Sequence, residues 1–375
     1  MERAGVTLKI TWVSPNGDGW ATAKKLRDGG NKVVYFNPSE NKNGLGYLPS
    51  VPEAAWKDYA LKSDLIVVDA NFGSRATRRS FSPSDYVLDL AQIRRKGMQY
   101  IGPTPTSELF ENDLRYQKKL LSRLGVPYVP TEHVIDGKEG VPLILNESDI
   151  RLTVSRDPDG RCYLVFRHRH LLADGNGPEI GNLGDVVISL RADSKLVQQS
   201  TKLVEPLLER LRFNGYFNLD LVLTHDSQPH IAGLTTSFLY PAVFAQFASF
   251  LSGDSQRSDL GLAVTVLRLD QDSDTSAEQV MNLPGFFGCE IHRDFDEGRA
   301  VVHSNSTATT VGGVGVGGPP NFVGAIVSCG PDFPSVKDKV DRQLMGSLPR
   351  GWGFRDNLGG SAGDSLRRLN EFGLL

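Results

Sequence analysis

The stretch Tyr100-Ile101-Gly102-Pro103-Thr104, followed further on by Leu124-Gly125-Val126-Pro127, decides the fold of this chain. The first motif ends an apolar strand at a Gly-Pro turn, where a strand does not continue. The segment between the two motifs has the spacing of an amphipathic helix, carried by Leu109, Phe110, Leu114, Leu120, Leu121 and Leu124. The second motif is a helix stop. The junction therefore predicts a strand, a turn, a helix and a new strand.

The composition is that of an ordinary globular protein. Of the 375 residues, 39% are hydrophobic and 23% are charged, and the formal net charge is −3. This length predicts about two or three domains, and the charge predicts no general affinity for nucleic acid or acidic membranes. We expect no membrane span and see no signal-peptide core. Cys162, Cys289 and Cys329 are far apart in the sequence, so we expect no disulfide framework, no structural zinc and a cytoplasmic location.

Apolar strands and helices alternate through the first part of the chain. The expected strands are 8–13, 32–36, 64–69 and 99–101, and the expected helices are 20–28 and 85–96. Because the strands are continuous apolar runs, they predict an α/β fold with a doubly wound parallel sheet. Ligands of such sheets bind at the carboxyl ends of the strands. Three loops therefore qualify as a binding site: Ser14–Trp20, Asp69–Arg79 and Gly102–Thr106.

The rest of the chain is richer in hairpins. Asp157-Pro158-Asp159-Gly160 is a turn that joins the expected strands 151–156 and 161–167. A helix is expected from about 107 to 135, and the other expected elements are helix 195–212, hairpin 217–224 with 229–234, helix Ala242–Leu251, strand 264–269 and helix 335–346. The glycine-rich run 311–318 predicts a surface loop, because no Gly-Lys-Ser/Thr follows it.

Two segments of the first part could hold an anion. Asn16, Gly17 and Gly19 lie between a strand and a helix, where backbone N–H groups can bind a phosphate. A plain tight turn is the other interpretation. Arg75 and Arg78 follow the third strand, and guanidinium groups suit phosphate oxygens, although a solvated charged loop has the same composition.

A glycine-rich segment follows the second expected strand of the first hairpin. Its chemistry-bearing residues are His168, Asp174, Gly175, Gly177 and Gly181. Glycines at this density let a backbone approach a ligand closely, and the alternative is a surface Ω-loop. The alternation of His168 with a second histidine two residues later could also bind a metal, but no third ligand is evident.

Three motifs together resemble phosphoribosylamine–glycine ligases (glycinamide ribonucleotide synthetases), a family of ATP-grasp carboxylate–amine ligases. The junction at 100–127 resembles the one between that family's first two domains. Segment 167–184 resembles its Asp-His-Lys-Arg and the glycine-rich loop that follows, and segment 229–241 resembles its Pro-Lys-Val-Ile-Glu-Phe-Asn-Cys-Arg-Phe-Gly-Asp-Pro strand.

The resemblance implies a domain order and a substrate site. It implies a preATP-grasp α/β domain at 1–106, a reduced ATP-grasp core at 107–285, a small β-rich C-terminal domain at 286–359 and a tail at 360–375. It also implies that the first loop and the glycine-rich loop line one substrate site.

The same resemblance predicts a degenerate ATP site. The family's metal-binding Glu falls on Gly233, its Asn on Thr235, its Asp on Tyr240, and its ATP-contacting Lys on Leu114. Magnesium that bridges phosphates needs hard oxygen ligands, which glycine cannot supply. Between Glu132 and Ile150 the family has a whole lid subdomain, so the lid is expected to be deleted.

Two functions from different classes follow. The first is a ligase-like protein that has lost ATP-dependent ligation, needs no cofactor, and binds a phosphorylated sugar or nucleotide-like ligand through the residues named above. The second is an active carboxylate–amine ligase of purine metabolism that uses ATP and magnesium. A structural or assembly protein on the same fold is a further alternative, because fold does not fix function.

Overall fold

The structure, a computed structural model, describes most of the chain. The described residues are 7–15, 17–38, 48–52, 55–71, 93, 95–128, 150–170, 179–223, 229–240, 242–243, 246, 260–268, 286–288, 291–292, 294–296, 299–302, 310–311, 315–316, 322–347, 352–354, 358 and 360–375. The expected strand within 141–145 and the stretch in which the lid is expected to be missing lie outside these residues, apart from Ile150.

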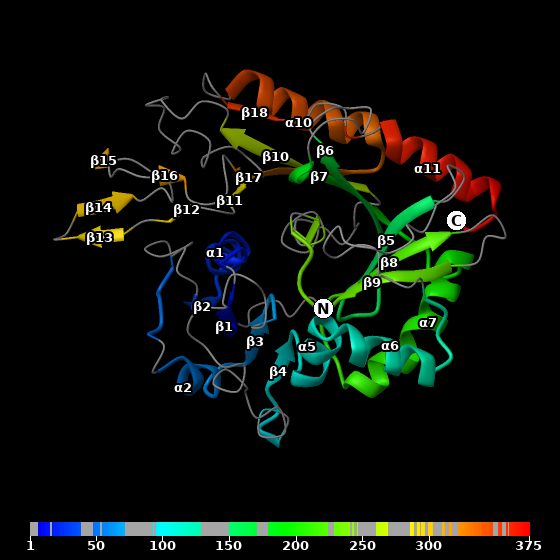
Figure 1. The fold of residues 1–375 in the computed structure, drawn as a ribbon. Coiled ribbons are helices and arrows are strands. Elements are labelled where there is room, and N and C mark those ends of the chain that lie inside the picture. Colours follow the sequence, from blue (N-terminus) through cyan, green and yellow to red (C-terminus); the bar gives the residue numbers. More distant parts are fainter. Residues whose placement is uncertain are drawn as a thin grey trace.

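The first part of the chain forms a four-stranded parallel sheet of order β2-β1-β3-β4 (Figure 1). Its strands are β1 (Lys9–Val13), β2 (Lys32–Phe36), β3 (Leu65–Val68) and β4 (Gln99–Ile101). All were expected from their apolar runs, and helix α1 (Trp20–Asp28) has its expected bounds. The short helix α2 (Trp56–Ala60) was not expected. Of the expected helix 85–96, only residues 93, 95 and 96 are described.

Two helices, α5 (Pro105–Asn112) and α6 (Leu114–Arg123), stand where one was expected from about 107 to 135. Asp113 has extended backbone angles and ends α5, and its carboxylate accepts hydrogen bonds from the Arg115 and Tyr116 amides to begin α6. Thr104 and Ser107 form a capping box at the start of α5, with proline at the first helical position. The Gly-Pro-Thr turn is therefore a strand end and a helix start, as predicted.

The second part of the chain is built on a nine-stranded sheet. Its path runs β11-β17-β10-β7-β6-β5-β8-β9, and β18 also pairs with β10. These strands, all antiparallel to their neighbours, are β5 (Ile150–Arg156), β6 (Cys162–His170), β7 (Glu179–Ser189), β8 (Phe217–Leu223), β9 (Pro229–Thr235), β10 (Leu260–Arg268), β11 (Phe286–Gly288), β17 (Phe322–Gly330) and β18 (Trp352–Phe354). The chain is thus mixed α/β, with one parallel and one large antiparallel sheet.

The C-terminal part adds strands and two helices to this sheet. Among its described residues, two small sheets lie outside the large one. The first pairs β12 (Ile291–His292) with β16 (Gly315–Val316), and the second has the order β13 (Asp294–Asp296), β14 (Arg299–Val302) and β15 (Thr310–Val311). Helices α10 (Phe333–Ser347) and α11 (Gly360–Glu371) lie along one side of the large sheet (Figure 1). The segment expected as a tail therefore contains a helix.

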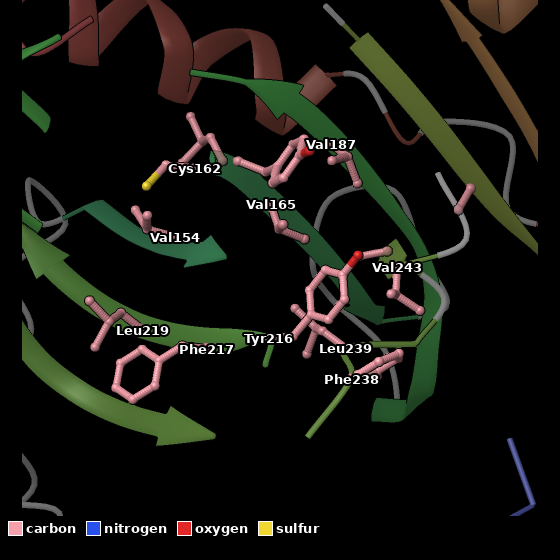
Figure 2. Packing of buried hydrophobic residues seen from close by; sticks show 14 of the residues in the cluster. Val154, Cys162, Val165, Val187, Tyr216, Phe217, Leu219, Phe238, Leu239 and Val243 are labelled. Atoms are coloured by element: carbon pink, nitrogen blue, oxygen red, sulfur yellow. The ribbon is translucent and has the colours of Figure 1, made fainter. Parts of the chain in front are cut away.

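One face of the large sheet carries its apolar core. Alternate residues of neighbouring strands meet there, with Val154 opposite both Leu164 and Leu219. Figure 2 shows Val154, Cys162 and Leu219 of this cluster lying together. Helix α7 (Lys195–Leu211), capped by Ser194, contributes buried residues to the same cluster, and the Leu196 amide donates to the Leu374 carbonyl beyond α11. The opposite face also carries buried apolar side chains, Val165 and Val187, next to the polar Thr153.

Candidate functional site

Asp69 lies at the carboxyl end of β3 and organises the end of the four-stranded sheet. Its Oδ2 atom accepts hydrogen bonds from Trp12 Nε1 at 2.9 Å, Ser14 Oγ at 2.7 Å and Tyr240 Oη at 3.1 Å. Asp69 and Ser14 are fully buried. We call Trp12, Ser14, Asp18, Asp69 and Tyr240 the Asp69 cluster. It occupies the position at which ligands of parallel sheets bind.

The first loop wraps tightly around this carboxylate. The Ser14 carbonyl accepts from the Gly17 amide, whose residue has a φ of 79°, and Ser14 Oγ accepts from the Gly19 amide. A Cβ atom on Gly19 would lie 1.8 Å from Asp69 Oδ2 and 2.4 Å from Trp12 Nε1. Gly19 is therefore required by packing. Helix α1 begins after it without a side-chain cap and without an acidic residue in its first turn.

Burial raises the pKa values of the acidic groups in the cluster. Burial raises the pKa of Asp69 to about 6, although the hydrogen bonds from Ser14, Trp12 and Tyr240 oppose the shift. Asp18 is only partly exposed, and its pKa is raised to about 7. Burial is the larger cause, and the nearby negative charge of Asp69 is the smaller one. Burial and the same carboxylate raise the pKa of Tyr35 well above its ordinary value. The cluster thus holds two carboxyl groups that change charge near neutral pH.

Some acceptor atoms at this end of the sheet are buried without a partner. Within the described part of the chain, Asp69 Oδ1 and Asn71 Oδ1 have no hydrogen-bond donor. A buried unpaired acceptor costs free energy unless a ligand or a water molecule donates to it. These atoms make this end of the sheet suited to a ligand that carries hydroxyl or amine donors.

The segment after β9 ties the two sheets together. The Phe238 amide donates to the Asp69 carbonyl at 2.7 Å, and the Asn71 amide donates to Ser237 Oγ at 3.1 Å. Asn218 of β8 donates its side-chain amide to the Ser237 carbonyl, and the rings of Trp12 and Phe238 meet edge to face. The segment after β9 and the carboxyl end of β3 are therefore in direct contact.

The second face of the large sheet carries polar side chains, and we call it the polar face. Asp220 of β8 is exposed and accepts from Thr153 Oγ1 of β5 at 2.6 Å. It stands opposite Gly233 of β9, where an added Cβ would lie 3.0 Å from Asp220 Oδ2. Further along the sheet, Arg167 Nε lies 3.8 Å from the fully buried carboxylate of Asp185. Glycine at 233 thus has a carboxylate directly beside it.

The end of β9 is held by a carboxylate from helix α5. Glu111 Oε1 accepts from Thr235 Oγ1 at 2.7 Å, and its Oε2 accepts from the Thr236 amide at 2.9 Å and from Thr236 Oγ1 at 3.0 Å. Thr235 Oγ1 also accepts from the Ser237 amide. We call these contacts the Glu111 clamp. They bind both threonines to the protein itself.

The residues expected at the site have different outcomes. Gly17 and Gly19 lie at the carboxyl end of β1, as predicted, but their geometry is explained by packing on Ser14 and Asp69. On β6, His168 is in register with Gly184, and Gly181 lies in β7. The other expected residues lie outside the described part of the chain: Asn16, Arg75, Arg78, Asp174, Gly175 and Gly177. The expected meeting of the two loops in one cleft therefore stays a prediction.

The polar residues that the sequence reading missed are Asp18, Glu111 and Asp220. The sequence did contain a signal for Asp220, because this carboxylate interrupts an otherwise apolar strand. Tyr240 was interpreted as the loss of an acidic residue, whereas its hydroxyl donates a hydrogen bond to Asp69.

The described residues contain no group of three or more side chains arranged to hold a metal ion. They also contain no helix long and apolar enough to span a membrane.

Comparisons with known proteins identify the fold. No family model matches the chain, and no curated protein matches it in sequence. Phosphoribosylamine–glycine ligase from Thermotoga maritima has a TM-score of 0.58 at 13% identity, over 93% of this chain and 99% of that one. The biotin carboxylase domain of 2-oxoglutarate carboxylase from Hydrogenobacter thermophilus has a TM-score of 0.54 at 12% identity, over 98% of each chain.

These similarities confirm the recognised resemblance at the level of fold. The phosphoribosylaminoimidazole carboxylase ATPase subunit from Aquifex aeolicus is a further structure of this kind, with a TM-score of 0.50 at 14% identity, over 90% of this chain and all of that one. The chain therefore has the fold of the ATP-grasp ligases over most of its length. At such low identity the likeness concerns the fold alone, and the function must be argued from the site.

Proposed function

We propose that the protein binds a phosphorylated sugar or a nucleotide-like ligand and does not form amides at the expense of ATP. The observation that carries this proposal is the Glu111 clamp beside Gly233 at the end of β9. Catalysis of phosphoryl transfer depends on metal ions and cations that neutralise phosphate charge. The described end of β9 offers no carboxylate of its own, and its threonine hydroxyls are already bonded within the protein.

The Asp69 cluster suits the hydroxyl end of such a ligand. Sugar hydroxyls donate hydrogen bonds. This end of the sheet offers them acceptors: the partly exposed Asp18, and Asp69 Oδ1 and Asn71 Oδ1, which have no donor among the described residues. A phosphate would be repelled by the same carboxylates. We therefore place the phosphate toward arginines, for which Arg75 and Arg78 remain the residues proposed from the sequence.

A second candidate is an active carboxylate–amine ligase that makes an amide through an acyl phosphate. Asp220 favours it, because this exposed carboxylate fills the space beside Gly233 in which a β9 side chain would lie. A carboxylate is a suitable magnesium ligand. In this candidate, a residue on β8 replaces the oxygen ligand that β9 lacks.

Binding measurements separate the two candidates. We expect calorimetry to show binding of ribose 5-phosphate, no binding of ATP with magnesium at about 1 mM, and weaker sugar phosphate binding in Asp18→Asn. Asp193→Asn, at an exposed position on a different loop, is the control. Release of ADP that requires both glycine and phosphoribosylamine, and that is lost in Asp220→Asn, would establish the ligase instead. Failure of every sugar phosphate and nucleotide tested to bind would reject the proposed function.

A further inference from the structure

A cavity of about 390 Å³ opens beside β4, away from the residues of the Asp69 cluster. Its walls come from the edge strand β4, the turn between β5 and β6, and the segment that follows α7. Figure 1 shows β4 at the end of its sheet, next to α5. Cavities of this size are typical of small-molecule sites, which are common where separately folded layers meet. This cavity shares no residue with the site described above.

Hydrogen bonds hold the walls of the cavity in place. Asn214 donates its side-chain amide to the Tyr100 carbonyl at 2.7 Å, and its own carbonyl accepts from the Gly102 amide at 2.9 Å. The Tyr100 hydroxyl donates to the Pro103 carbonyl, which fixes the tyrosine ring. A ligand that enters would therefore meet a preorganised wall and would lose less free energy in ordering it.

The lining combines an apolar surface with two opposite charges. Ile93, Met98 and Ile101 supply the apolar part. Asp159 and Arg212 supply the charges, and both side chains are at the exposed edge of the cavity. Asp159 also lies 3.7 Å from Arg161, so a ligand cation there would share its carboxylate. Such a lining suits a small molecule that carries both charges and an apolar group.

The backbone at Arg212 gives a second reason to look for a ligand. Arg212 ends α7 with a φ of 49° and a ψ of 40°, in the left-handed region. It is the one described residue other than glycine with a positive φ. Helix ends of this kind usually have glycine or asparagine, because a Cβ atom disfavours the conformation. A guanidinium group is thus present where the backbone alone would favour glycine, and such exceptions cluster at functional sites.

We propose that this cavity binds a free α-amino acid with an apolar side chain. The carboxylate of the amino acid pairs with the Arg212 guanidinium, its ammonium group pairs with the Asp159 carboxylate, and its side chain packs on Met98 and Ile101. The proposal is independent of the proposed function, because no residue is shared between the two sites.

Titration with L-leucine and L-phenylalanine tests the proposal. We expect saturable binding to the full chain by calorimetry or by saturation-transfer NMR at concentrations below about 10 mM. Arg212→Gly and Asp159→Asn should each weaken binding about tenfold or more, since each removes one charge-assisted contact. Glycine is compatible with the left-handed backbone at 212, and position 159 is exposed, so both variants are expected to fold. Absence of saturable binding by both amino acids up to that concentration would overturn the proposal.

Ligand analogues and a distant variant serve as controls. 3-Phenylpropionate lacks the ammonium group and phenethylamine lacks the carboxylate, so each should bind about tenfold or more weakly than L-phenylalanine. Arg342→Gln, on the exposed side of α10, should bind L-phenylalanine as the natural chain does. Equal binding of 3-phenylpropionate and L-phenylalanine would overturn the proposal, and so would unchanged amino acid binding in both Arg212→Gly and Asp159→Asn.

Discussion

The Asp69 cluster and the polar face of the large sheet both present carboxylates, but in opposite surroundings. Asp69 is fully buried and accepts three hydrogen bonds on one oxygen, while its other oxygen has no donor among the residues that the structure describes. Asp220 is exposed and accepts from one described side chain, Thr153. Water can replace a lost partner at Asp220 but not at Asp69. Burial, more than residue type, therefore sets the free-energy cost of changing a carboxylate.

The two regions also differ in their structural role. The Asp69 cluster joins β1, β3 and the segment after β9, so it fixes how the two sheets meet. The polar face leaves a carboxylate in contact with solvent, where an incoming group can reach it. The stability of the molecule should therefore depend on the first region more than on the second, where an exposed carboxylate can be changed at little cost in stability.

A matched pair of glycines gives the largest expected contrast. In Gly19→Ala the new Cβ would lie 1.8 Å from Asp69 Oδ2, inside a fully packed cluster. We expect the free energy of unfolding to fall by about 3 kcal/mol or more. In Gly233→Ala the nearest atom is Asp220 Oδ2 at 3.0 Å, the end of an exposed side chain that can move away. Urea unfolding monitored by tryptophan fluorescence should show a loss below about 1 kcal/mol there, and equal losses would contradict the comparison.

Removing each carboxylate gives the next contrast. Asp69→Ala leaves Trp12 Nε1 and the Ser14 and Tyr240 hydroxyls without their acceptor in the interior. We expect a loss of about 3 kcal/mol in the free energy of unfolding. Asp220→Ala removes the partner of one hydroxyl, that of the buried Thr153, but the position of the lost carboxylate is exposed and water can take its place, so the loss should stay below about 1 kcal/mol. Urea denaturation of both variants measures the difference, and a larger loss in Asp220→Ala would reverse the assignment of the two regions.

The stability of the protein should depend on pH through Asp69. Its pKa is raised from 3.8 to about 6 by burial, so the folded protein keeps a proton that the unfolded chain loses above about pH 4. The stabilisation is complete below pH 3.8 and is lost as the pH rises through about 6, by about 3 kcal/mol in total. Because the pKa of Asp18 is raised to about 7, the decrease should continue toward neutral pH.

Asp69→Asn provides the test of this dependence. The amide oxygen can still accept from Trp12, Ser14 and Tyr240, while the titrating proton is gone. Urea midpoints measured from pH 4 to pH 7.5 should fall more steeply for the natural chain than for the variant, and Asp18→Asn should flatten the upper part of the decrease. The same slope in the natural chain and in Asp69→Asn would show that this carboxyl group does not titrate in the interval.

The sequence predicted the elements whose signal is local. The strands of the first sheet are continuous apolar runs, and the Gly-Pro-Thr turn carries its own capping residues, so both were found. Helix α11 was read as a tail because it begins with Gly360 and has few apolar residues. Its buried residues Ala362 and Leu369 belong to the main apolar cluster and, together with Leu366, have the i, i+4, i+7 spacing of an amphipathic helix, a pattern that the sequence prediction overlooked.

The site depended on contacts between distant parts of the chain. Tyr240 and Asp69 are 171 positions apart, and Glu111 and Thr236 are 125 positions apart. The resemblance predicted that Gly233 stands where the family has a carboxylate, but the sequence could not show that Asp220 lies opposite Gly233, because that depends on the register of β8 and β9. The neighbours of Gly233 could therefore be known only from the fold.

The Glu111 clamp lies between the two regions in the stability loss that we predict, with Glu111→Ala above Asp220→Ala and below Asp69→Ala. Glu111→Ala removes the acceptor of three hydrogen bonds at the end of β9, but the carboxylate is only partly buried, so water can replace part of them. We expect a loss of about 1 to 2 kcal/mol in the free energy of unfolding. Glu111→Gln keeps one acceptor oxygen and should lose about half as much.

Glu205→Ala, at an exposed position on α7, is the control and should change stability by less than about 0.5 kcal/mol. If Glu111→Ala instead cost as much as Asp69→Ala, the end of β9 would belong to the buried region. If it cost nothing and allowed magnesium ATP to bind, the clamp would be the element that closes a latent ATP site.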